Sequence, residues 1–153
     1  MRNTITFAFY SVILLFSACK TEPDSKAIKQ EVLNIHDKLM IDGEKVIKNR
    51  MKLDTLLLST ELKTATDSSR QKISALIDKL NKADENMMDW MHFFKDDFKG
   101  KTEQEDLNYY KSQMIKIREV EDNYIKATKE SDSVLKIYNI NPAEKMEMSN
   151  HKH

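Results

Sequence analysis

The sequence predicts an all-α protein built as an up-down-up bundle of three long, coiled-coil-like helices. Between Pro23 and Pro142 the only glycines are Gly43 and Gly100, and strands and hairpins would need more turn residues than that. Apolar residues also recur at helical spacing over three stretches of the chain. The breaks between these stretches are short, so consecutive helices should be antiparallel neighbours.

The first element is predicted to be a leader and not part of the bundle. A positive charge at Arg2 is followed by an apolar and aromatic stretch from Ile5 to Phe16. This order is typical of a secretory signal peptide, and the stretch is too short to span a bilayer. We therefore expect residues 1–18 to be a signal peptide.

Cys19 is the only cysteine of the chain and follows the small residues Ser17 and Ala18. This segment resembles the lipobox of bacterial lipoproteins. The resemblance implies that Cys19 is acylated, becomes the first mature residue and attaches the protein to a membrane. Residues 19–25 would then form a polar, lipidated tether, because Pro23 cannot sit inside a helix.

The first helix is predicted over residues 26–63, followed by a polar break at 64–67. Ser68 with Gln71 reads as a capping box that opens a second helix over 68–98. Its inward positions alternate steps of four and three residues, a heptad pattern, at Ile73, Ile77, Leu80, Asp84, Met87, Met91, Phe94 and Phe98.

Gly100 is predicted to stop the second helix, and Thr102 with Glu105 forms the capping box of a third helix over 103–138. The bundle would span residues 26–138 and be about 50 Å long. After it, residues 139–153 are polar and follow a helix end, which is typical of a mobile tail. A long helical hairpin that dimerises is the main structural alternative, so a homo-oligomer stays open.

Composition excludes several classes of function. The chain carries 25 basic and 25 acidic residues, and loss of Arg2 with the signal peptide leaves it close to neutral, so nucleic acid is not an expected partner. With Cys19 acylated, no thiol remains for a disulfide or a catalytic cysteine. The sequence lacks a Ser-His-Asp set, a phosphate-binding loop and a second well-placed histidine. We therefore expect no enzyme activity.

Four charged residues are predicted to share one layer in the middle of the bundle: Arg50, Asp84, Arg118 and Glu121. Matching the helices by level from their predicted turns places Arg50 beside position 81 of the second helix and Glu121 of the third. Such a cluster would set the alignment of the helices. A catalytic carboxylate pair is the other interpretation.

Methionine and histidine residues offer a soft-metal hypothesis, since thioether sulfur and neutral imidazole suit Cu(I). One set faces the interior of the bundle at His36, Met40, Met87 and Met91, and a second lies in the tail at Met146, Met148, His151 and His153. No cofactor is otherwise expected. The alternative is structural, because methionine is a flexible core filler and the tail residues are compatible with an incidental polar terminus.

Apolar residues on outward helix faces indicate a partner surface. Ile41, Phe93 and Ile115 point away from their own seams, and Trp90 lies at a flank. Exposed aromatic and aliphatic side chains near one level mark a protein contact or a fourth packed segment.

The segments 35–40 and 86–91 resemble small helical lipoproteins of the Bacteroidota, some of them labelled viral A-type inclusion protein, a label that implies no activity. Lys20 stands where, by resemblance to enterobacterial lipoproteins, an Asp would imply retention in the inner membrane, so the outer membrane is favoured. The leading hypothesis is a non-catalytic envelope lipoprotein that binds another protein or spaces two surfaces. A copper-binding lipoprotein is the alternative, and periplasmic and surface exposure both stay open.

Overall fold

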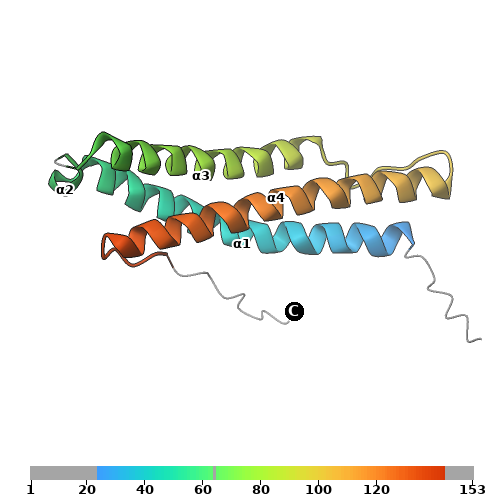
Figure 1. Cartoon of the computed structure of the whole chain (residues 1–153). Coiled ribbons are helices and arrows are strands. Elements are labelled where there is room, and N and C mark those ends of the chain that lie inside the picture. The colour runs from blue at the N-terminus through green and yellow to red at the C-terminus, as the bar shows by residue number, and fades with distance from the viewer. Residues whose placement is uncertain (1–23, 64, 144–153) are drawn as a thin grey trace, which may run out of the picture.

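A computed structural model describes residues 24–63 and 65–143. Their elements are α1 (Ser25–Leu58), the short α2 (Thr60–Lys63), α3 (Asp67–Phe93) and α4 (Glu103–Ile137). The predicted up-down-up three-helix bundle is confirmed (Figure 1). The predicted signal peptide, Cys19 with most of its tether, and the tail from residue 144 lie outside the described residues.

Helix α1 begins directly after its N-cap residue, Asp24, and ends earlier than predicted. The Asp24 carboxylate accepts a hydrogen bond from the Ala27 amide at 2.7 Å, which satisfies a free donor of the first turn. The prediction of one continuous helix to residue 63 is wrong, because Ser59 adopts an extended backbone with ψ of 156°. Its hydroxyl then accepts from the Leu62 amide at 3.3 Å and caps α2.

Both ends of α3 differ from the sequence prediction. Its N-cap is Thr66, whose hydroxyl accepts from the Ser69 amide, so the proposed capping box at Ser68 is wrong. The helix ends at Phe93 and not at residue 98. Gly100 is therefore not its stop signal.

Residues 94–102 form an ordered loop because aromatic side chains of α4 bind it. The ring of Phe98 stacks on Tyr109 with centroids 4.0 Å apart. The Tyr109 hydroxyl accepts from the Lys95 amide at 2.7 Å, and the Tyr110 hydroxyl donates to the Asp96 carbonyl at 3.0 Å. These contacts replace the backbone hydrogen bonds that another helical turn would have made.

Helix α4 begins at the predicted Thr102 cap, whose hydroxyl accepts from the Glu105 amide at 3.2 Å. After Ile137 the chain turns through Asn139, which has a positive φ of 56°. The Ile140 amide donates back to the Leu135 carbonyl at 2.9 Å. This is the left-handed helix ending that asparagine tolerates well.

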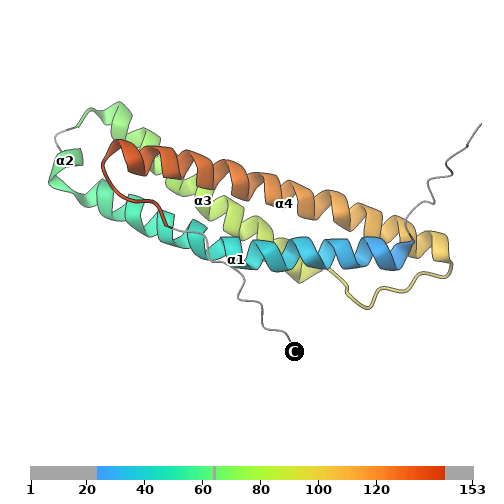
Figure 2. The same ribbon diagram turned by 90° about the horizontal axis from the view of Figure 1, so that it is seen from below.

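Residues 139–143, which follow α4, pack on the bundle. The prediction of a mobile tail over residues 139–153 is therefore wrong for these five residues. Lys52 of α1 donates to the Asn141 carbonyl at 2.7 Å, and the Ala143 amide donates to Asn49 at 2.8 Å. Figures 1 and 2 show this segment turning back along the bundle after α4.

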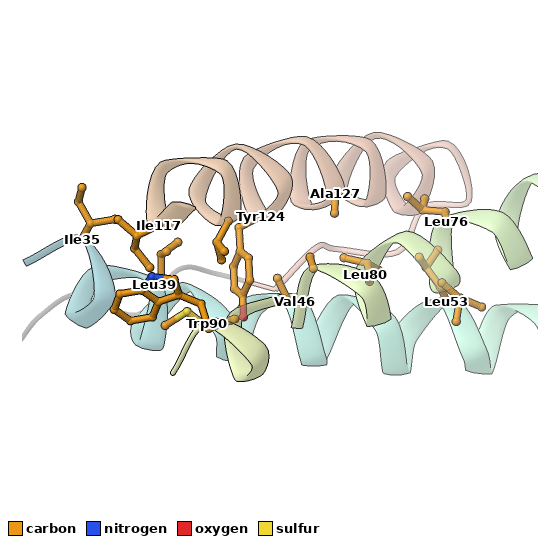
Figure 3. Packing of buried hydrophobic residues seen from close by; sticks show 14 of the residues in the cluster. Ile35, Leu39, Val46, Leu53, Leu76, Leu80, Trp90, Ile117, Tyr124 and Ala127 are labelled. Atoms are coloured by element: carbon orange, nitrogen blue, oxygen red, sulfur yellow. The ribbon is translucent and has the colours of Figure 1, made fainter. Parts of the chain in front are cut away.

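The buried side chains form one continuous core along the bundle (Figure 3). Leu39 and Leu53 of α1, Leu80 of α3 and Ile117 of α4 are each at most 1% exposed. Figures 1 and 2 show α1 and α4 side by side over most of their lengths, whereas α3 ends partway and loop 94–102 continues to the end of the bundle. No helix among the described residues is long and apolar enough to cross a membrane.

The register of α4 against α1 differs from the predicted one. Glu121 pairs with Lys38 of α1 at 2.5 Å and not with the level of Arg50. The two positions on α1 are 12 residues apart, a displacement of about 18 Å at the rise of an α-helix. The cause is loop 94–102, because extended chain advances about twice as far per residue as a helix and carries the start of α4 farther along α1.

Candidate functional site

A groove follows the seam between α3 and α4. It consists of three hollows of about 300, 230 and 680 Å³. The first shares Asn86 and Asn123 with the second, and the second shares Lys79, Lys126 and Glu130 with the third. We call this surface the α3–α4 groove, and it is lined by residues between 72 and 93 of α3 and between 113 and 134 of α4.

The lining of the α3–α4 groove includes small and apolar residues that also belong to the core. Ala83 of α3 lies opposite Ala127 of α4 in the middle hollow, while Leu76 lines the hollow at one end and Val120 the hollow at the other, and all four are buried. Alanine at two of these positions leaves space at the seam, because a methyl group cannot fill the distance between two helices packed 8–10 Å apart.

Two of the four residues predicted to form a partner surface, Trp90 and Phe93, line one end of this groove. Trp90 is 7% exposed, and its ring stacks on Phe94 with centroids 4.6 Å apart. Phe93 is 71% exposed. Ile115 is exposed and Ile41 half-buried, and neither lines the groove. The four residues therefore do not form one continuous patch.

Charge is unevenly distributed along the α3–α4 groove. Its lysines are Lys72, Lys79, Lys82, Lys116, Lys126 and Lys129, and its acids are Asp89, Glu119 and Glu130. Lys79 and Glu130 pair across the seam at 2.6 Å. The half near Leu76 therefore carries an excess of positive charge, whereas the half near Trp90 has two acids and one lysine.

The charged cluster predicted at mid-bundle does not form. Arg50 donates to Asn81 at 3.1 Å, as its predicted level on α3 requires. Arg118 instead pairs with Glu31 at 2.5 Å and with Glu121 at 3.3 Å, near the other end of α1. The shift in α4 register carries Arg118 and Glu121 away from Arg50, and these two residues stay paired with each other.

Asp84, the remaining member of that prediction, faces a buried tyrosine. The Tyr124 hydroxyl donates to the Asp84 carboxylate at 3.4 Å. Burial raises the pKa of Tyr124 well above its usual value of 10.0, and the negative charge of Asp84 raises it further. Tyr124 is therefore a neutral hydrogen-bond donor at physiological pH and a poor nucleophile.

Two further shifts belong to the loop end of the bundle. Burial raises the pKa of Tyr110. A hydrogen bond to Asp96, in an ion pair of 2.8 Å, raises the pKa of Lys29. Both groups hold loop 94–102 against the helices.

The side chain of Asn49 forms a buried polar network that the sequence analysis missed. Its amide nitrogen donates to the Ser131 hydroxyl at 2.9 Å and to the Asp132 carboxylate at 2.7 Å. Its oxygen accepts from the Ala143 amide. A sequence signal existed, because Asn49 lies three residues after Val46 and four before Leu53, on the buried stripe of α1.

The candidate metal ligands of the bundle interior have different environments. The prediction that Met40 faces the interior is wrong, because Met40 is 52% exposed, whereas Met87 is 2% exposed and Met91 packs against the core. The His36 ring lies 5.6 Å from Trp90 and its Nδ1 lies 3.0 Å from the Asp37 carboxylate. Within the described residues, no three His, Cys, Asp or Glu side chains gather around a potential ion site. Met146, Met148, His151 and His153 lie outside those residues.

No family model, curated protein or solved structure matches the chain. The candidate site accordingly rests on the geometry of the described residues.

Proposed function

We propose that this protein is a non-catalytic envelope lipoprotein, attached to a bacterial membrane through acylated Cys19, whose helical bundle binds another protein. The observation that carries the binding role is the α3–α4 groove, an elongated concave surface with the exposed Phe93 at one end. Aromatic side chains at the edge of a concave apolar surface are typical anchors for protein partners.

The position of the bundle relative to Cys19 supports the anchoring role. Helix α1 begins at Ser25, six residues after the cysteine, and the Asp24 cap fixes that start. With its 34 residues, α1 extends about 50 Å. A bundle of this length, joined to the lipid by a segment of six residues, would leave its groove accessible to other envelope proteins.

The charged and phenolic groups of the interior support a role without catalysis. Tyr124 stays protonated because it is buried beside Asp84, and Arg50 is bonded to Asn81. These contacts join helices to one another, which fits the stabilising role that we propose for these groups.

The anchoring proposal is tested by metabolic labelling with an alkyne fatty-acid analogue in the bacterial host. We expect the wild-type protein to incorporate the label and to fractionate with membranes, since buried acyl chains give stable attachment. Cys19→Ser should lose the label and appear as a soluble or uncleaved form. Equal labelling of both proteins would refute acylation at Cys19.

A further inference from the structure

We propose that the α3–α4 groove binds an amphipathic α-helix of another protein, with acidic residues flanking the apolar stripe of that helix. The inference rests on the proposed interaction function and names the chemistry of its partner. The docked helix would become the fourth helix of the bundle.

The shape of the groove matches a helix. Its lining on α3 extends from Lys72 to Phe93, about 30 Å along the helix axis, which corresponds to a partner helix of about 20 residues. The three hollows follow one another along a single seam. A seam between two antiparallel helices is also where an additional helix packs in a four-helix bundle.

The side chains of the groove offer both close approach and an anchor. Ala83 and Ala127 are buried in its lining, and small residues let the backbone of a partner helix come close. At the end of α3, Phe93 exposes 71% of its surface beside Trp90, which would allow an apolar side chain of the partner to pack against it.

Charge complementarity selects an acidic partner. Lys72, Lys116, Lys126 and Lys129 make no ion pair within the described part of the chain, whereas Glu130 is already paired with Lys79. Three of these four lysines lie in the half of the groove near Leu76. Acidic flanking residues should therefore contact that half, and like charges there would oppose a basic helix.

The C-terminal segment of the same chain is not the proposed occupant. Its last described residue, Ala143, is bonded to Asn49 and thereby held on the other side of α4, at the seam with α1. A second copy of the chain remains a distinct outcome that the experiment separates.

The test uses the full mature chain carrying Cys19→Ser, which removes the acyl acceptor and keeps every described residue. The probe is a 20-residue amphipathic peptide without Trp or Tyr, with leucine on one face and glutamate at the flanking positions. Trp90 is the only tryptophan of the chain and lines the groove, so its fluorescence reports binding at this site. A matched control peptide carries lysine in place of each glutamate.

We expect the acidic peptide to change Trp90 emission with saturation, and the basic peptide to bind at least about tenfold more weakly. The double variant Lys126→Glu and Lys129→Glu should weaken the acidic peptide by about tenfold and strengthen the basic one. Lys48→Glu on α1 is the control, because Lys48 pairs with Glu44 outside the groove. Thermal unfolding of each variant checks that the bundle is intact.

Equal binding of the two peptides, or no change of Trp90 emission with either, would overturn the proposal. A mature chain that is dimeric by light scattering and becomes monomeric with Phe93→Ser would also overturn it, since the groove would then hold a second copy. None of these outcomes affects acylation at Cys19, so the anchoring proposal and this inference fail independently.

Discussion

Asn49 shows how one polar side chain connects three parts of the molecule. It is 0% exposed and bonds Ser131 and Asp132 of α4 and the backbone of Ala143. A buried amide is tolerated only when its donors and acceptor are satisfied. The three bonds meet this requirement and hold residues 140–143 against the bundle.

We predict that Asn49→Ala destabilises the protein by about 2–4 kcal/mol, because it leaves the Ala143 amide unsatisfied and opens a cavity. Asn34→Ala is the matched control on the exposed face of the same helix and should cost less than about 0.5 kcal/mol. Urea unfolding followed by circular dichroism gives both values. Equal effects of the two substitutions would show that the Asn49 network contributes no stability.

The raised pKa of Tyr124 predicts that the protein loses stability in alkaline solution. Because burial raises its pKa in the folded state above the usual 10.0, the unfolded chain releases the phenolic proton first. The contribution of the protonated Tyr124 phenol to the free energy of unfolding is fully present below about pH 10 and is lost as pH rises above it. We expect Tyr124→Phe to flatten the fall in unfolding free energy above pH 10 while changing stability little at pH 7, since its bond to Asp84 is long at 3.4 Å. Parallel pH profiles of the two proteins would contradict this.

At the scale of elements, the helices were predictable and some of their ends were not. The apolar spacing and the Thr102 cap located α4 correctly, because local hydrogen bonding decides a helix start. The end of α3 was missed because Phe94 and Phe98 continue the helical spacing. Their aromatic contacts with α4 and Trp90 favour a loop instead, and such long-range contacts are not encoded in local periodicity.

The caps themselves give a prediction at this scale. Thr102→Ala should cost about 1 kcal/mol, because the Glu105 amide loses its acceptor. Ser68→Ala should be close to neutral, because Ser68 lies inside α3 and its predicted capping role belongs to Thr66. Chemical unfolding of both variants distinguishes them, and a larger cost at Ser68 would assign the capping role to Ser68 in place of Thr66.

For the whole molecule, the sequence predicted the bundle, but the register between α1 and α4 depended on the length of one loop. That register decides which charged residues meet, so Glu121 contacts Lys38 while Arg50 contacts Asn81. The groove was predictable only in part. The positions of Trp90 and Phe93 in the sequence indicate a surface, whereas the common location of the lysines depends on how α3 packs against α4.

The charge of the whole chain predicts that the lipid, and not the protein surface, attaches the molecule to membranes. Basic and acidic residues are equal in number, and removal of Arg2 with the proposed signal peptide would leave one acid in excess. The groove lysines are spread over about 30 Å, and Lys79 and Lys82 among them are already paired with Glu130 and Glu85, whereas binding to anionic lipid requires several clustered basic residues at about 1 kcal/mol each. We expect the mature Cys19→Ser chain to stay in the supernatant when sedimented with phosphatidylserine vesicles at physiological salt.

The acylated protein should sediment with phosphatidylcholine vesicles and stay bound at high salt, because acyl chains partition independently of charge. Salt-sensitive sedimentation of the acyl-free chain, abolished by Lys126→Glu with Lys129→Glu, would instead assign the groove lysines to the lipid surface.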